Sequence, residues 1–463
     1  MSVFLGIDIG TTAIKIGVIQ DNQVLYASES MLQTYGDAVV KYQKGHELLM
    51  TLKEAILTIP IIFRQQIETI AFSTAMHSLM PDNEYQQIFL WSDFQAAEAI
   101  EAFKKTDQAK QFYTISGTPI HAMSPFAKIL ALRNGYPENI HWYGIKELVL
   151  RYFTGKALID YSTASATGLF DIHKKRWSNE ILAYLKIEET QLGELADPTQ
   201  LFEILPEICQ VFDFKSSVKV MAGASDGVLA AYASFYRTGR SASLTIGTSA
   251  AVRQVVSDVR LNYGKQNFCY YLNEHYYVCG APSNNGGCVL NWAAEQFERE
   301  SLDFFVSLPD ILAQTEVGAK NLRFWPFLNG ERAPYWSNDI TGGFQELTLQ
   351  HRKNDMIRSI IEGLLLNIAR LVELVAPNEE LSISGGFFQT AVLGELASDI
   401  FGTTCYYAVE NEPIFGLYYL LEQPKLPREN AKQIFSVNRA NHDKYQEISK
   451  KYFYEIDQLL AQK

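Results

Sequence analysis

Apolar and polar residues alternate at the start of the chain in the way expected for strands joined by tight turns. An apolar run, Val3–Ile9, is followed by Gly10-Thr11-Thr12, a second apolar run, Ala13–Ile19, and then a turn at Asp21-Asn22. Val24–Ser28 supplies a third strand, so this segment predicts an antiparallel meander with no helical period. A strand rather than a helix follows the glycine turn, and neither a Walker-type loop nor a G-x-G-x-x-G string occurs.

The same arrangement returns in the second half of the chain. Ser243–Ile246 predicts a strand, Gly247-Thr248-Ser249 a turn, and Ala250–Val256 a second strand. The turn glycines Gly10 and Gly247 lie 237 positions apart, which is about half of the chain. Two weakly similar halves predict a duplicated domain with a ligand in the cleft between the copies.

Helical and strand patterns alternate between the two hairpins, which is typical of an α/β fold. Short strands such as Thr69–Phe72 separate the predicted helices, which are Glu47–Ile59, Gln95–Lys105, Ile145–Phe153 and Gly227–Tyr236. We place the domain boundary near Thr238-Gly239, which gives an N-terminal domain of residues 1–238 and a C-terminal domain of residues 239–463.

Composition limits the classes of function. With 463 residues and 47% apolar residues the chain is long enough for two cores. The net charge of −12 disfavours nucleic acid and anionic membranes as partners. The five scattered cysteines contain no C-x-x-C pair, and we find neither an apolar run that spans a bilayer nor a secretion signal, so the expected location is the cytoplasm.

The first hairpin carries phosphate-binding chemistry. Gly10, Thr11 and Thr12 offer backbone N–H and hydroxyl donors to phosphate oxygens. Asp8 before the turn and Lys15 after it can hold hydrated magnesium and a phosphate tail. The alternative is an ordinary hairpin with an incidental aspartate, and the second copy at residues 247–249 favours the phosphate interpretation.

A second candidate is Asp226, in the string Gly223-Ala224-Ser225-Asp226-Gly227 between a predicted strand and a predicted helix. Such an aspartate is commonly only a helix N-cap. It can instead be a general base that accepts the proton of a sugar hydroxyl during phosphoryl transfer. Its place about twenty residues before the second hairpin favours the base.

The paired hairpins resemble those of the actin, hexokinase and heat-shock chaperone superfamily, and almost the whole chain resembles the FGGY family of carbohydrate kinases. The stretches Gly286–Trp292, Gly330–Trp336 and Ile361–Gly363 add to this resemblance. It implies two actin-like ATPase (ribonuclease H-like) domains with an interdomain cleft. It also implies that Asp226 is the catalytic base and Asp8 belongs to the magnesium site. Phosphate or nucleotide contacts are implied for Gly10, Thr11, Thr12, Lys15, Gly247, Thr248, Gly287, Asn291, Gly386 and Thr390. We expect Glu331-Arg332 to form a structural ion pair.

Three further segments resemble the gluconate kinase branch of that family. They are Ser73–Leu79, Trp91-Ser92-Asp93 and Gly117–Pro125. The substrate contacts that this resemblance implies are Met76, His77, Trp91, Asp93, His121 and Asp226. Asp93 would bind hydroxyls, Trp91 would form a flat wall, and a histidine would face the carboxylate. The alternative for each histidine is a buried structural role. Gln95 stands where the family often has arginine.

The expected reaction is therefore ATP-dependent phosphorylation of a small sugar or sugar acid, with D-gluconate as the first choice. The expected cofactors are ATP and Mg²⁺, the expected partners are these small molecules, and a homodimer is compatible with the sequence. The alternatives are a kinase for xylulose or a related polyol, and an actin- or chaperone-like ATPase switch with no sugar substrate.

Overall fold

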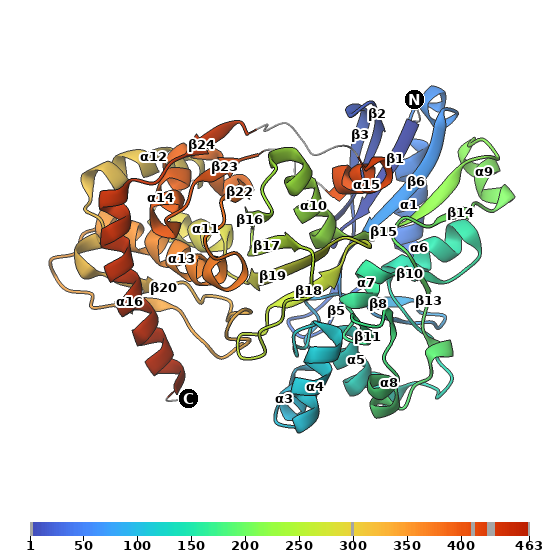
Figure 1. The fold of residues 1–463 in the computed structure, drawn as a ribbon, viewed down its shortest axis with the longest axis horizontal. Helices are drawn as coiled ribbons and strands as arrows, with labels where there is room; N and C mark the ends of the chain where they lie inside the picture. The colour runs from blue at the N-terminus through green and yellow to red at the C-terminus, as the bar shows by residue number, and fades with distance from the viewer. Residues whose placement is uncertain (1–2, 298–300, 409–412, 424–430, 462–463) are drawn as a thin grey trace. The chain divides into compact units, whose positions relative to one another are not determined.

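The computed structural model describes residues 3–297, 301–408, 413–423 and 431–461 (Figure 1). The chain divides into two compact units that interleave along the sequence. The first unit comprises residues 1–233, 256–279 and 411–425, and the second comprises residues 234–255, 280–410 and 426–463.

The first unit is built on a six-stranded sheet whose order is β14-β15-β6-β1-β2-β3. Its strands are β1 (Val3–Ile9), β2 (Ala13–Gln20), β3 (Gln23–Met31), β6 (Ile67–Thr74), β14 (Leu201–Glu203) and β15 (Lys219–Ser225). β1, β2 and β3 pair antiparallel, which confirms the meander predicted from the alternating runs. β6 pairs parallel to both β1 and β15, so the C-terminal ends of these three strands meet at one edge.

Helices and small sheets complete the first unit. The helices are α1 (Gly45–Leu57), α2 (Ile61–Arg64), α3 (Ala97–Lys104), α4 (Asp107–Ser116), α5 (Pro125–Leu132), α6 (Ile145–Thr154), α7 (Tyr161–Ser165), α8 (Asn179–Leu185), α9 (Pro206–Phe212) and α15 (Pro413–Glu422). The short strands are β4 (Tyr35–Gly36), β5 (Lys41–Lys44), β7 (Met80–Pro81), β8 (Gln87–Phe89), β9 (Trp142–Tyr143), β10 (Leu158–Asp160), β11 (Phe170–Asp171), β12 (Arg176–Trp177), β13 (Glu194–Ala196) and β18 (Phe268–Tyr271).

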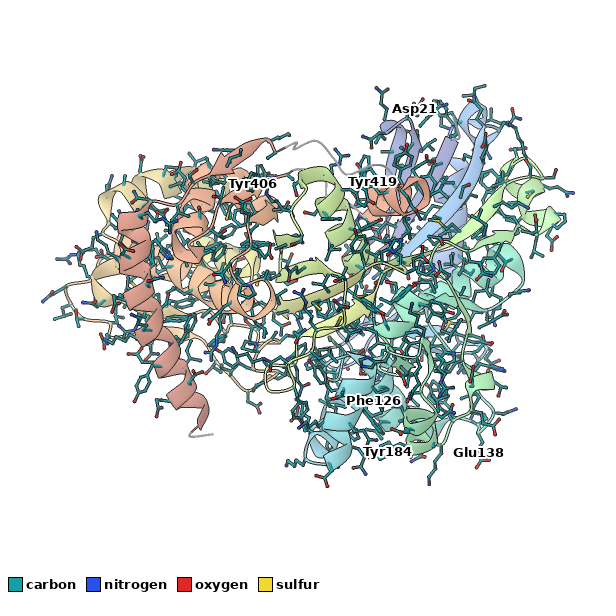
Figure 2. The ribbon with its side chains drawn as sticks, viewed as in Figure 1. Asp21, Phe126, Glu138, Tyr184, Tyr406 and Tyr419 are labelled. Carbon is teal, nitrogen blue, oxygen red and sulfur yellow. The ribbon has the colours of Figure 1, made fainter. Side chains whose placement is uncertain are left out.

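Two hydrophobic cores lie within the first unit. One joins the sheet to α1, α6 and α9 through residues such as Ile7, Leu52 and Phe153. The other gathers α3, α4, α5 and α8 around Phe103, whose ring centroid lies 4.9 Å from that of Phe126 and 5.4 Å from that of Tyr184; Figure 2 labels both partners. Burial of such aromatic clusters supplies much of the free energy that stabilises a core.

The segment α15 belongs to the first unit although it is just over 400 residues from β1 in sequence. A Cβ atom added to Gly6 or Gly17 would lie 2.8 or 2.9 Å from Ile414 Cγ2, so these paired glycines leave the space that Ile414 fills. Tyr419, labelled in Figure 2, donates a hydrogen bond of 3.2 Å to Asn22 Oδ1 at the β2–β3 turn. Through these contacts α15 packs against β1, β2 and the β2–β3 turn of the first sheet.

The second unit repeats the central topology of the first. Its sheet contains the order β17-β16-β22-β23-β24, with β16 antiparallel to β17 and parallel to β22. The strands of the second half are β16 (Ala242–Ile246), β17 (Ala250–Val256), β19 (Tyr277–Ser283), β20 (Arg323–Trp325), β21 (Gly343–Gln345), β22 (Leu381–Ser384), β23 (Cys405–Tyr407) and β24 (Gln433–Phe435). Because β15-β6-β1-β2 and β23-β22-β16-β17 share one order and one set of directions, the predicted duplication is confirmed.

The remaining helices are α10 (Asp226–Thr238), which begins in the first unit, and α11 (Gly287–Phe297), α12 (Ser301–Gln314), α13 (Lys353–Val375), α14 (Ala391–Phe401) and α16 (Arg439–Ala461). Within the described parts of the chain, each helix is too short or too polar to cross a lipid bilayer.

Candidate active site

The first hairpin closes at the edge where β1, β6 and β15 end. The Gly10 N–H donates to Ala13 O at 3.0 Å, and the carbonyls of Thr11 and Thr12 accept bonds from Gln43 Nε2 and from Leu32 N. The carbonyl oxygens of the turn are therefore held by bonds from other segments, and Thr11 is partly buried while Thr12 is exposed. A threonine hydroxyl can donate to an anion, and the phosphate contact of this turn stays a prediction.

Asp8 lies at the end of β1, directly opposite Lys15 on β2 and Ser73 on β6. Ser73 Oγ donates a 2.6 Å hydrogen bond to Asp8 Oδ1, and Asp8 is only 9% exposed. A carboxylate fixed in this way offers hard oxygen ligands of the kind that Mg²⁺ prefers. The described residues contain no group of three or more acidic, histidine or cysteine side chains placed to hold a metal ion.

Asp226 lies at the same edge of the first sheet as Asp8. It follows β15 and is the first residue of α10, and its Oδ1 accepts the N–H of Gly227 at 2.8 Å. Ala224 on β15 pairs with Ser73 on β6, and Ser73 pairs with Asp8 on β1, so β6 lies between the two strand ends that carry the carboxylates. The first unit therefore has the predicted base and the predicted magnesium ligand at the same edge of the sheet, on either side of β6.

The predicted sugar-binding residues lie in loops of the first unit. His77 adopts a left-handed backbone with φ of 67°, and its Nδ1 is 2.8 Å from Ala166 O. His121 is 5% exposed, and its Nδ1 accepts the N–H of Met123 at 3.2 Å. Asp93 is fully buried and accepts hydrogen bonds from Lys41 N and from the backbone and side chain of Gln95. Met76 and Trp91 are half-buried.

A lysine that the sequence analysis missed joins these loops. Lys128 on α5 is fully buried, and its Nζ donates to His77 O at 3.1 Å and to Met123 O. Burial lowers the pKa of the Lys128 ammonium to about 7, and the charge of Asp93 opposes that shift. The sequence did contain a signal for this residue, because Lys128 is the single charged residue within the apolar run Pro125–Leu132. The loops at His77 and His121 are thus tied to one buried cation.

The predicted nucleotide residues of the second unit line one pocket of about 520 Å³. Gly247 and Thr248 of the second hairpin, Gly287 and Asn291 of α11, and Gly386 and Thr390 before α14 all contribute. The sequence analysis missed the apolar part of the lining, Ile246, Phe305, Val306, Pro309 and Phe387, together with Gln389. A pocket with polar glycine turns and an apolar wall is suited to a nucleotide.

Close backbone contacts hold the polar side of this pocket together. The Gly287 N–H donates to Gly247 O at 2.6 Å, and the Cys288 N–H donates to Thr248 O at 3.1 Å. Gly385 has a φ of 101°, and a Cβ there would lie 2.1 Å from Ile246 O, so only glycine allows β22 to end against β16. The strand end of β16 and the start of α11 are therefore fixed to each other.

The Glu331-Arg332 string is held by hydrogen bonds to other segments, and the expected ion pair between the two side chains stays a prediction. The Glu331 carboxylate is 1% exposed and accepts hydrogen bonds from Ser283 Oγ, Asn284 N and Asn367 Nδ2, among others. Burial raises the pKa of this carboxyl. Arg332 donates to Ser283 O at 2.9 Å. The segment fastens the loop after β19 to α13.

A larger hollow of about 790 Å³ lies elsewhere on the first unit, between residues 133–142 and 186–191. It contains none of the predicted site residues, and its lining is mostly exposed. The size of a hollow alone is therefore a poor guide to the site in this protein.

A duplicated actin-like topology, a glycine-lined pocket and an aspartate at a sheet edge agree with the class of two-domain sugar kinases. Residues 3–233 match the N-terminal domain of the FGGY family of carbohydrate kinases, and residues 242–416 match the C-terminal domain. The chain therefore belongs to the FGGY family of carbohydrate kinases, and it is an ATP-dependent phosphotransferase.

Individual relatives agree with this family. The chain is 32% identical to a gluconokinase of Bacillus subtilis over 86% of this chain and 83% of the relative, and 27% identical to a xylulose kinase of Lactococcus lactis over 90% and 86%. It also resembles the crystal structure of a gluconate kinase from Lactobacillus acidophilus, with a TM-score of 0.92, 27% identity and coverage of 99% and 98%.

Proposed function

We propose that this chain transfers the γ-phosphoryl group of ATP to D-gluconate, giving ADP and 6-phospho-D-gluconate. The observation that carries the choice of gluconate is the 32% identity to gluconokinases over 86% of the chain, against 27% for a xylulose kinase. The strings around His77, Asp93 and His121 support the same choice, because a sugar acid needs both hydroxyl acceptors and donors for its carboxylate.

In this proposal the first unit binds the sugar and the second binds the nucleotide. Met76, Trp91 and Asp93 would contact the polyol chain, and His77 and His121 would face its carboxylate. On the nucleotide side, the 520 Å³ pocket would hold adenosine, with Gly386 and Thr390 near it and Gly247 and Thr248 at the phosphates. We propose functional domains at residues 1–238 and 239–463, whose border lies within a few residues of the change of compact unit at Ala233.

Asp226 would act as the general base. Its carboxylate accepts the proton of the terminal hydroxyl as that oxygen forms a bond to the γ-phosphorus and the bond to the β-phosphate oxygen breaks. A positioned base of this kind typically contributes ~10²–10⁴ in rate. Thr11, Thr12 and Lys15 would donate to the phosphate oxygens, and Gly10, whose N–H closes the turn on Ala13 O, would let the phosphates approach closely. Because the turn is already ordered, these donors need little rearrangement.

The residues present also fit magnesium. Asp8 would hold the ion through its carboxylate, in part through water, and the ion would neutralise charge on the phosphates when bound.

All five cysteines lie in the described residues as thiols, which supports a reducing cytoplasm as the location.

The test is a coupled assay of ADP release with gluconate, xylulose and glycerol compared side by side. We expect gluconate to give the highest kcat/KM by a wide margin. Asp226→Asn should lower kcat by ~10²-fold or more while nucleotide binding persists, because the amide cannot take the proton. Asp82→Asn, which removes a carboxylate paired with Arg151 away from the sheet edge, is the matched control and should retain turnover. Normal turnover by Asp226→Asn would remove Asp226 from this role.

A second candidate is a kinase for xylulose. It is favoured by the structural match to a xylulose kinase from Lactobacillus acidophilus, which has a TM-score of 0.92 and 27% identity. A preference for xylulose in the same assay would establish it. Hydrolysis of ATP that is equally fast without any sugar would instead favour an ATPase switch.

A further inference from the structure

A second buried lysine lies beneath the sheet edge that carries Asp8 and Asp226. Lys146, on the first turn of α6, has no exposed side-chain surface. Its Nζ donates to Phe72 O at 2.6 Å, to Ala222 O at 2.9 Å and to Ala224 O at 3.3 Å, and it lies 3.0 Å from Asp160 Oδ2. One ammonium group is therefore shared among three backbone carbonyls and one carboxylate.

The three carbonyls belong to the two strands that end at the site. Phe72 precedes Ser73, whose hydroxyl holds Asp8, and Ala224 stands two residues before Asp226. Between Met221 and Ala224 the pairing of β15 with β6 shifts by one residue, which forms a bulge around Gly223. The bulge turns two carbonyls of β15 toward Lys146, so the lysine fixes the path of the chain into Asp226.

A second contact reaches the same strand end from α7. Asp160, the partner of Lys146, caps α7 by accepting the Thr163 N–H at 2.7 Å. Ser162 Oγ on this helix lies 3.0 Å from Ser225 Oγ, next to Asp226. Figure 1 shows α6, α7 and β15 grouped in the first unit. Lys146 and Asp160 thus join α6, α7, β6 and β15 at one point.

The charges that act most strongly on Lys146 are carboxylates. Burial lowers the pKa of the Lys146 ammonium, and the charges of Asp160, Glu147 and Asp226 oppose that shift. Because Coulombic coupling is mutual, a charged Lys146 also favours the ionised form of Asp226, which is the form that a general base requires.

We propose that Lys146 is a positioning residue for phosphoryl transfer: it holds the bulged end of β15 against β6, and so sets the place and the charge of Asp226. This proposal rests on the proposed function, in which Asp226 is the base. The lysine itself does not touch the reacting atoms.

The test compares Lys146→Met with Lys128→Met. Both variants remove a fully buried ammonium that donates to backbone carbonyls, but only Lys146 holds the strand before Asp226. We expect Lys146→Met to lower kcat by ~10²-fold, since small displacements of a reacting group cost about that much. The acid limb of its pH profile of kcat/KM should move to higher pH. Lys128→Met should instead raise the sugar KM and leave that limb in place.

The double variant Lys146→Met/Asp160→Asn removes both charges of the pair, so no unpaired charge remains buried and the fold is retained. It should stay as slow as the single variant. If its turnover returns to the wild-type level, Lys146 serves only to neutralise Asp160 and the proposal fails. Wild-type kcat and an unmoved pH limb in Lys146→Met, or the same pH shift in Lys128→Met, would also overturn it.

Amide hydrogen exchange separates this proposal from the proposed function. Residues 222–227 should exchange at least ~10-fold faster in both variants that lack Lys146 than in the wild type, whichever sugar is the substrate. If Asp226→Asn keeps full activity, and the amides of residues 222–227 lose protection in the variants that lack Lys146, the base assignment fails and the positioning contact stands. Unchanged exchange refutes the contact itself.

Discussion

Glu147, the neighbour of Lys146 in sequence, allows a quantitative prediction about pH and stability. Its side chain is 4% exposed, and Oε2 accepts the Gly144 N–H at 2.9 Å at the start of α6. Burial raises the pKa of this carboxyl from 4.5 to about 7, and the nearby Asp160 charge acts in the same direction. The fold therefore favours protonated Glu147 more than the unfolded chain does.

The sign of the pH effect follows from this difference. Because the folded pKa exceeds the unfolded one, the stabilisation by this group is complete below a pH of about 4.5 and is lost as pH rises through about 7. With these two pKa values, the free energy of unfolding falls by about 1.3 kcal/mol between about pH 6 and pH 8 through this residue alone.

Glu147→Gln should remove this dependence. The amide oxygen can still accept the Gly144 N–H, and the amide carries no charge at either pH. We therefore expect the unfolding free energy of the variant, relative to the wild type, to rise by about 1.3 kcal/mol from about pH 6 to pH 8. The measurement is urea unfolding at several pH values, followed by the fluorescence of the buried Trp142 and Trp177 in the same unit.

Comparison with a control keeps the result interpretable. Titrating groups that do not interact with Glu147 cancel in the difference between variant and wild type, and Asp160 and Lys146, which do interact with it, contribute to that difference. Glu68→Gln, at an exposed position of β6, should follow the wild-type curve. Parallel curves for Glu147→Gln and the wild type would show that Glu147 is ionised in the fold at all these pH values, and would refute the reasoning.

Two glycine substitutions test the close contacts of the two sheets. Gly223→Ala should destabilise the first unit by about 2 kcal/mol or more, because φ is 76° and the new Cβ would lie 2.1 Å from Phe72 O; thermal unfolding measures this, and an unchanged melting temperature would contradict it. Gly287→Ala should raise the KM for ATP by roughly 10-fold and spare the sugar KM, because its Cβ would lie 2.7 Å from Gly247 O in the nucleotide pocket. An unchanged KM for ATP would show that the close contact between residues 287 and 247 does not determine the shape of the pocket.

Local chemistry explains what the sequence could predict. The hairpins at Gly10 and Gly247 depend on glycine, on hydroxyl residues and on the apolar runs beside them, and all of these signals lie within about 15 residues. The observed strands β1, β2 and β17 accordingly match the predicted ones to within one residue. The resemblance to the FGGY family then led to six residues that line one pocket.

Side-chain contacts moved some predicted boundaries. The helix predicted from Gln95 begins at Ala97, because the Gln95 N–H and amide both bind Asp93 and hold the chain in a turn. After β22, a 3₁₀ turn over Gly386–Gln389 comes before α14, which begins at Ala391. Propensity alone does not show such competition between a side chain and the helix.

Contacts between distant segments left no local signal. Residues 256–279 supply Val256, Cys269 and Cys279 to the second core of the first unit, and α15 places Ile414 over Gly6 and Gly17. The apolar wall of the nucleotide pocket comes from Phe305 on α12, a helix that carries no phosphate motif. These segments are positioned by the packing of the whole unit, which a linear pattern does not encode.

The two units hold their candidate sites by different physical means, and the difference follows from the charges involved. In the second unit, glycines at 247, 287 and 385 bring backbones together, and the pocket contains no buried charge of its own among its described lining residues.

The first unit must instead hold carboxylates, at Asp8, Asp93 and Asp226, in a chain of net charge −12. Carboxylates gathered in a buried region repel one another and tend to protonate unless a cation is near. Two buried lysines supply such cations. Lys128 interacts electrostatically with Asp93, and Lys146 interacts electrostatically with Asp226. Each ammonium also binds backbone carbonyls of the loops and strand ends that carry these candidate residues, so each lysine joins a charge and a backbone contact at one place in the fold.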